Sequence, residues 1–162
     1  MSPASHSRNG SALGPAQTSK RFGVTGGKDE SPQLSWSGAP EGTKGYVVTV
    51  FDLDAPREGG YWHWAVVNIP AGTGSLPAGA GAQGGSHLPA GAVQLKNDAG
   101  FPGYLGAAPP PGHGPHRYIV AVHAVDVEVL GLDAGASTEA LVRKLASHAL
   151  GRAVITGHFE RG

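Results

Sequence analysis

Five polar side chains at the ends or edges of apolar runs suit the recognition of a negatively charged group. Asp52 and Asp54 follow the run YVVTVF, His63 lies in YWHWAVVNIP, and His116 and Tyr118 lie in PHRY. A protonated imidazole donates charge-assisted hydrogen bonds to phosphate or carboxylate, and a nearby carboxylate favours that protonated form. The residue types therefore predict two histidines that bind an anion and two aspartates that keep them charged.

Each of these residues also has a purely structural interpretation. Pro56 ends the strand after Asp52 and Asp54, so the two carboxylates alone are better explained as turn caps. His63 shares its strand with large apolar residues, where a hydrogen-bonded core imidazole is common. A binding site is favoured by the combination, because all these groups lie where separate strands begin or end and would line one pocket.

Other chemistries fit the sequence less well. Two carboxylates and two imidazoles would satisfy zinc or manganese, but no HxH or HxxxH spacing occurs. The chain has no cysteine and no GxSxG turn, so no nucleophile motif is present. We therefore expect no metal, no cofactor and no enzyme activity.

Length and charge narrow the function classes further. A chain of 162 residues is the size of one domain. Lysine plus arginine number 12 and aspartate plus glutamate number 12, so no bulk charge draws the protein to nucleic acid. No apolar run reaches the roughly 20 residues of a transmembrane segment, and the N-terminus lacks a secretory signal. These features predict a cytoplasmic protein.

Strands dominate the pattern. Leu34 and Trp36 give a short strand with one apolar face, and GYVVTVFDLD is apolar on both faces and should be central. Further β-rich runs cover residues 61–70, 117–129 and 153–160. In the run over 61–70, alternation predicts one face with Trp62, Trp64, Val66 and Asn68, and another with Tyr61, His63, Ala65, Val67 and Ile69.

One segment, STEALVRKLASHAL, predicts an amphipathic helix that packs on a sheet. Ser137 is the expected N-cap, and Gly151 follows the predicted end. The predicted apolar stripe consists of Leu141, Val142, Leu145 and Ala149. With the strands, this helix predicts a mainly β fold with an amphipathic helix near the C-terminus.

Two segments lack a periodic apolar pattern. Residues 1–20 are predicted to be a loose tail, which leaves 21–162 as a single domain. Residues 71–115 hold 12 glycines and 7 prolines and form an unusually long connection. Within it, Asn97 and Asp98 with Gly100 and Gly103 indicate ordered turns.

The sequence resembles the phosphatidylethanolamine-binding protein family, in particular its bacterial branch related to Raf kinase inhibitor protein. The resemblance covers about residues 22–160 and rests on SPQLSWSGAP, DLDAP, HWAVVNIP and GYLGAAPPPGHGPHRY in that order. It implies two antiparallel sheets with Greek-key connections and a small pocket at one end. Carried over by position, the pocket residues are Asp52, Asp54, Pro56, Trp62, His63, Pro110, His116 and Tyr118.

The resemblance also implies roles. His63 and His116 would contact a phosphate-like anion or the head group of phosphatidylethanolamine, and Asp52 would orient and charge its neighbours. The two prolines would shape the walls, and the rings of Trp62 and Tyr118 would line the rim. Ala107 stands where the bacterial pattern usually has proline, which changes the expected shape of the pocket mouth. Bacterial members often form homodimers, although no interface is visible in the sequence.

Three functions remain open at this stage. The first is a binding protein for phosphate, phosphorylethanolamine or a phospholipid head group, with a regulatory role in signalling, and it is favoured. The second is an inhibitor of a kinase or protease that uses the pocket rim and the 71–115 connection. The third is a phosphoester or ester hydrolase with His63 or His116 as general acid or base.

Overall fold

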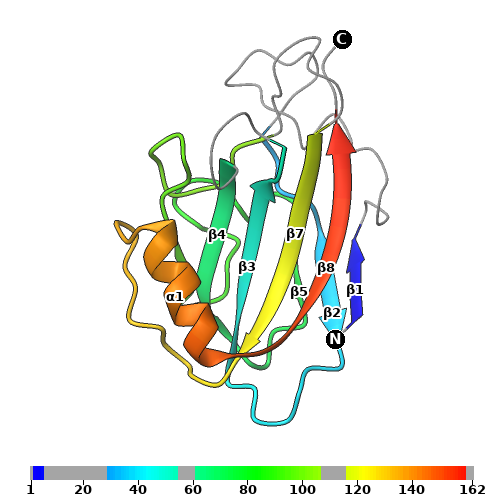
Figure 1. Ribbon diagram of the computed structural model, residues 1–162, viewed down its shortest axis with the longest axis vertical. Coiled ribbons are helices and arrows are strands. Elements are labelled where there is room, and N and C mark those ends of the chain that lie inside the picture. The colour runs from blue at the N-terminus through cyan, green and yellow to red at the C-terminus, as the bar shows by residue number, and fades with distance from the viewer. Residues whose placement is uncertain (1, 6–28, 55–60, 107–115, 160–162) are drawn as a thin grey trace.

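The computed structural model (Figure 1) describes residues 2–5, 29–54, 61–106 and 116–159. Two antiparallel sheets and one helix make up these residues. The smaller sheet has the strand order β1 (Ser2–Ser5), β2 (Leu34–Ser37), β5 (Ser75–Leu76). The larger has the order β6 (Val93–Gln94), β4 (Tyr61–Pro70), β3 (Gly45–Asp52), β7 (His116–Val125), β8 (Ala149–Phe159). The helix α1 (Thr138–His148) precedes β8. The predicted mainly β fold with two antiparallel sheets is confirmed.

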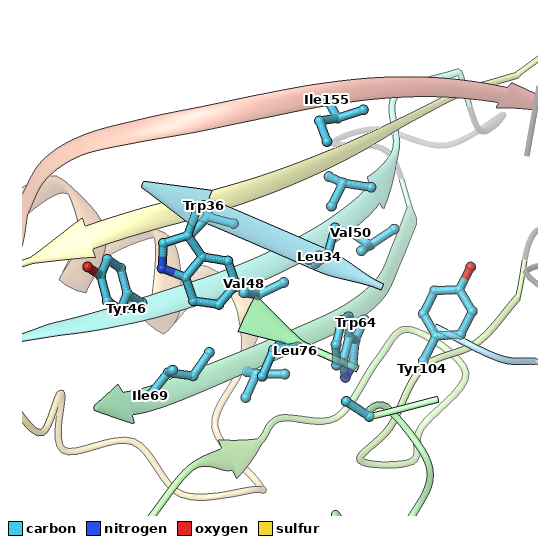
Figure 2. Close-up of a cluster of buried hydrophobic side chains, with 14 of the residues drawn as sticks. Leu34, Trp36, Tyr46, Val48, Val50, Trp64, Ile69, Leu76, Tyr104 and Ile155 are labelled. Atoms are coloured by element: carbon cyan, nitrogen blue, oxygen red, sulfur yellow. The ribbon is translucent and has the colours of Figure 1, made fainter. Parts of the chain in front are cut away.

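β3 is the central strand of the larger sheet, as its two apolar faces predicted. All of its residues except Phe51 are buried. One face contributes to a core between the two sheets, and the other contributes to a second core with α1. Figure 2 shows the core between the sheets, with labelled side chains that come from both sheets and, at Tyr104, from the long connection after β4: Leu34, Trp36, Tyr46, Val48, Val50, Trp64, Ile69, Leu76, Tyr104 and Ile155.

The helix confirms its predicted N-cap and corrects its predicted stripe. The Ser137 hydroxyl accepts a hydrogen bond from the backbone N–H of Ala140 at 3.1 Å. Leu141 is fully buried, whereas Val142 is 51% exposed. Neighbouring helical residues point about 100° apart, so Leu141 and Leu145 share a face that Val142 does not. The helix ends at His148, and Ala149 is already extended and begins β8.

Two irregularities in β4 correct the predicted alternation of its side chains. Val50 pairs with Trp64 and Phe51 pairs with Trp62, so His63 is an extra residue without a partner on β3. Such a β-bulge re-aims the side chains around it. Trp62 consequently packs in the core under α1, while Trp64 lies in the core between the sheets.

A second register shift lies near the end of β4, between the pairs of Tyr46 and Val48. Asn68 has a positive φ of 60° there, and its side-chain oxygen accepts a hydrogen bond from the Leu130 backbone N–H at 2.9 Å. Ile69 therefore packs between the sheets with Val66, although alternation predicted it on the face of Val67.

Some predicted segment ends also differ. Ser2–Ser5 form β1 and pair with β2, although the sequence predicted a loose tail there. The strand predicted over 117–129 is His116–Val125, and the one predicted over 153–160 is Ala149–Phe159. Propensity alone misses such ends because pairing with a neighbouring strand, not local preference, decides them.

The long connection after β4 is ordered over its described residues, 71–106. The predicted turn at Asn97 is confirmed, because its side-chain oxygen accepts the N–H of Ala99 at 2.9 Å and Gly100 has a φ of 96°. Gln94 attaches this connection to the sheet. Its Oε1 accepts the indole N–H of Trp64 at 2.7 Å, and its Nε2 donates to the Ala82 carbonyl at 2.9 Å.

Gln94→Leu is expected to lower the free energy of unfolding by about 1 to 3 kcal/mol, because it leaves the buried Trp64 N–H without an acceptor. Urea unfolding of the variant and the parent protein measures this loss. Gln33→Leu is the matched control, since Gln33 bonds only the Ser35 hydroxyl in a partly buried position. Equal losses in both variants would contradict a special role for Gln94.

Candidate functional site

The candidate site lies where β3 ends and β4 and β7 begin, at the upper end of the larger sheet in Figure 1. Asp52 is the last residue of β3 and pairs with Tyr61 on one side and Tyr118 on the other. Directly paired residues in a sheet project to the same face. The register therefore brings residues far apart in the sequence to one face of the sheet.

The central contact of the site is a buried pair of Asp52 and His116. His116 Nδ1 lies 2.5 Å from Asp52 Oδ2, and the two side chains are only 1% and 5% exposed. A carboxylate accepts only, so the proton between them belongs to Nδ1 when Asp52 is ionised. The other oxygen, Oδ1, accepts the backbone N–H of Asp54 at 2.8 Å. Both carboxylate oxygens of Asp52 are thus engaged.

His63 joins this pair through aromatic contacts. Its ring centroid lies 5.4 Å from that of Tyr118 in an edge-on arrangement and 5.1 Å from that of Tyr61. Tyr118 in turn lies 6.5 Å from His116, with the two rings nearly parallel. These contacts depend on the bulge, because strict alternation would have turned His63 towards the helix-covered face.

The end of the long connection holds His63 in place. His63 Nδ1 lies 2.7 Å from the Leu105 carbonyl oxygen, and the Leu105 N–H donates to the His63 carbonyl at 2.9 Å. A carbonyl cannot donate, so Nδ1 carries the proton and the neutral ring presents Nε2 as an acceptor. His63 donates from Nε2 only when it is protonated.

The electrostatics of His63 differ from those predicted. Burial lowers its pKa below the ordinary value, and the Leu105 carbonyl and the carboxylates of Asp52 and Asp98 oppose this only in part. The sequence predicted that Asp52 and Asp54 would together keep both imidazoles protonated. At His63 desolvation outweighs the nearby negative charges, so the neutral form is favoured.

Asp54 does not face the histidines. Its Oδ2 accepts the backbone N–H of Arg117 at 2.7 Å and Nε at 2.9 Å, and its Oδ1 accepts Nη2 at 2.8 Å. The hydrogen bonds from Arg117 hold the pKa of Asp54 down at about 2. Arg117 therefore offsets most of the charge of Asp54, and the coulombic interaction of this carboxylate with His116 is a smaller contribution.

Several contacts here were not predicted from the sequence. Arg117 lies between two predicted residues, but alternation placed it on the far face. Asp98 accepts the Trp62 N–H at 2.7 Å and donates its own N–H to the Trp62 carbonyl at 3.0 Å, which places its charge near His63. Leu105 acts through its backbone, which no side-chain pattern reveals.

The remaining predicted residues are distributed differently. Trp62 stacks on Phe51 with centroids 5.4 Å apart and packs in the core under α1, so its ring is not brought to the histidines. Pro56, Pro110 and Ala107 lie outside the described residues. The structure thus groups Asp52, His63, His116 and Tyr118, with Asp54 tied to Arg117 beside them.

The described residues contain neither a candidate metal centre nor a candidate membrane-spanning helix. No group of three or more histidine, cysteine, aspartate or glutamate side chains among them could hold a metal ion. No helix in the same ranges is long and apolar enough to cross a membrane.

The sequence of this chain is similar to a family model and to several known proteins. A family model described as phosphatidylethanolamine-binding protein matches residues 5–160. YbcL of Escherichia coli (strain K12) is 44% identical over 153 residues, which cover 94% of this chain and 83% of YbcL. YbhB of the same organism is 47% identical over 133 residues, which cover 82% of this chain and 83% of YbhB.

Solved structures agree with these sequence matches. The crystal structure of Escherichia coli YbcL, described as a new member of the mammalian PEBP family, has a TM-score of 0.95 and 41% identity. The alignment covers 99% of this chain and 98% of that one. A putative phosphatidylethanolamine-binding protein homologue from Chlamydia trachomatis has a TM-score of 0.81 and 31% identity over 99% of this chain and 97% of its own.

Proposed function

This chain belongs to the phosphatidylethanolamine-binding protein family, and from that premise we propose that it binds small anionic ligands. The proposed ligands are phosphate, phosphorylethanolamine or a phospholipid head group, which share a phosphate. The proposed site consists of Asp52, His63, His116 and Tyr118. Family membership supports ligand binding in general, and the chemistry of these side chains supports an anion.

The observation that carries the proposal is the buried pair of Asp52 and His116, which the ring of Tyr118 connects to a second histidine, His63. A carboxylate on Nδ1 fixes the orientation of the imidazole and stabilises its protonated form. His116 is 1% exposed, and its hydrogen bond to Asp52 offsets the cost of burying it. A phosphate oxygen would accept charge-assisted hydrogen bonds from both imidazoles when they are protonated.

In this proposal the two histidines have different parts. His116 is held by a carboxylate, whereas His63 faces a carbonyl and its pKa is lowered by burial. His63 would accept a proton as the anion enters, because the anion supplies the compensating negative charge. Tyr118 would lie between the two imidazoles, in ring contact with each of them.

His116→Gln is expected to weaken phosphate binding about tenfold or more, because a charge-assisted hydrogen bond is worth about 1.5 to 3 kcal/mol. Isothermal titration calorimetry with inorganic phosphate and with O-phosphorylethanolamine measures this, at a temperature where circular dichroism shows both proteins folded. His63→Gln provides a second variant with the same expectation.

A matched control lies at the other end of β7. His148 Nδ1 lies 2.9 Å from Asp126 Oδ1, the same chemical pair as His116 and Asp52 but partly exposed. His148→Gln should leave the affinity for both ligands unchanged. Unchanged affinity in His63→Gln and His116→Gln, or an equal loss in His148→Gln, would contradict the proposed site.

A further inference from the structure

We propose that Asp54 and Arg117 are positioning residues, which hold Asp52 and His116 in binding geometry without touching the ligand themselves. This inference rests on the anion-binding site proposed above and adds two residues that act on it from outside. We call their ion pair the clamp. The clamp replaces the ligand-binding role that the sequence predicted for Asp54.

Three hydrogen bonds from Arg117 to Asp54 form the clamp. The guanidinium of Arg117 approaches the Asp54 carboxylate with two donors, Nε at 2.9 Å and Nη2 at 2.8 Å, and its backbone N–H adds a third at 2.7 Å. A two-point approach of this kind fixes direction as well as distance. The Leu53 N–H also donates to the Arg117 carbonyl at 3.0 Å. The segment after β3 is thus fastened to the start of β7.

Each end of the clamp lies next to a member of the buried pair of Asp52 and His116. Arg117 directly follows His116, and the backbone N–H of Asp54 donates to Asp52 Oδ1 at 2.8 Å. Asp52 Oδ2 then meets His116 Nδ1. A closed circuit therefore runs from Asp52 through Asp54 and Arg117 to His116 and back to Asp52. The clamp is therefore connected to both members of the buried pair.

The charges of the clamp persist at neutral pH. The hydrogen bonds from Arg117 hold the pKa of Asp54 at about 2, so its carboxylate is ionised there. Arg117 also cancels the charge of Asp54, which would otherwise stand as an uncompensated negative charge beside a site for anions. The side chains are 58% and 30% exposed, so the clamp contributes little to stability by itself.

The test uses two conservative variants of the full chain. Arg117→Lys keeps the positive charge but loses the two-point approach, and Asp54→Asn keeps the shape but loses the negative charge. Four quantities are measured in each: the titration of the His116 ring by NMR, the dissociation constants for inorganic phosphate and for O-phosphorylethanolamine by calorimetry, and the midpoint of thermal unfolding. Arg143→Lys is the control, because Arg143 forms an exposed ion pair with Glu139 on α1 at 2.7 Å.

We expect both variants to shift the His116 titration and to weaken phosphate binding about tenfold, as loss of supporting contacts around a binding group does. The unfolding midpoint and the Arg143→Lys control should not change. A merely structural role would lower the midpoint and leave the His116 titration of the folded protein unmoved, which overturns the inference.

Two further outcomes would overturn the positioning role. Weaker phosphate binding with an unmoved His116 titration would make Arg117 a direct ligand contact and overturn the positioning role. Loss of O-phosphorylethanolamine binding with phosphate binding retained in Asp54→Asn would assign Asp54 to the ammonium group and overturn it as well. If the parent protein binds no phosphate, the proposed function fails, and the His116 titration alone then judges the clamp.

Discussion

Asp52→Ala is expected to lower the free energy of unfolding by about 2 to 6 kcal/mol, because it leaves two donors without an acceptor at about 1 to 3 kcal/mol each. The loss is large because Asp52 serves two donors, His116 Nδ1 and the Asp54 backbone N–H. Both are left unmatched, and the 1% exposure of His116 keeps water from replacing the carboxylate. Urea unfolding at pH 7 measures the change.

The control for this prediction is the partly exposed pair of Asp126 and His148, at the other end of β7. Asp126→Ala removes the carboxylate partner of His148, whose side chains are 44% and 32% exposed. Exposed pairs contribute about 0 to 1 kcal/mol, so this variant should remain close to the parent protein. The double variant with Asp52→Ala and His116→Ala should lose less than the sum of its parts. Strict additivity, or similar losses in Asp52→Ala and Asp126→Ala, would show that the pair is not coupled.

The second large effect is the pH dependence of anion binding. Affinity for sulfate is expected to fall as the pH rises from 6 to 8, by at most about tenfold per pH unit, if one proton enters with the anion. Sulfate is the right probe because it keeps two charges over this range, whereas phosphate titrates near pH 7. Any slope then comes from the protein.

The direction of the pH dependence follows from the protonation of His63. Burial lowers the pKa of its imidazole, so the free site holds a neutral ring above that pKa. A bound dianion favours the protonated ring, and binding therefore takes up a proton. Uptake of a proton strengthens binding as the pH falls and weakens it as the pH rises. The charged or ionisable groups around His63 are Asp52 and Asp98, with the rings of Tyr61 and Tyr118 packed against it.

Calorimetry at pH 6, 7 and 8 in two buffers with different ionisation enthalpies counts the protons directly. His63→Gln should flatten the profile, because glutamine does not titrate, and His148→Gln should leave it unchanged. A sulfate affinity independent of pH in the parent protein would rule out proton uptake at this site. A slope that survives His63→Gln would transfer the uptake to another group.

The spacing of Asp52 and Asp54 shows where local reasoning holds and where it ends. Two residues apart in a strand share a face, which predicted two carboxylates at the histidines. β3 ends at Asp52, so the rule does not reach Asp54, whose carboxylate turns to Arg117 instead. Propensity locates a strand well, but its last residue depends on neighbours in the sheet.

His63 shows the same limit inside a strand. Alternation requires one residue opposite one residue, and the bulge at His63 breaks that count. The bulge is stabilised by Leu105, which is 42 residues away in sequence and contributes only backbone groups. No pattern within YWHWAVVNIP contains this information.

The sequence by itself determined the mainly β class, the central place of β3, the helix with its Ser137 cap, and which residue types are available for an anion site. These features follow from alternation, helical periodicity and side-chain chemistry, which act over a few neighbouring residues. The tertiary structure decided that Asp52 pairs with His116, that Asp54 pairs with Arg117, that Trp62 packs against the core on the α1 side of the sheet, and that His63 lies against Tyr118. Those choices depend on strand register and on burial, which arise only when segments far apart in the chain pack together, as the separation of 64 positions between Asp52 and His116 illustrates.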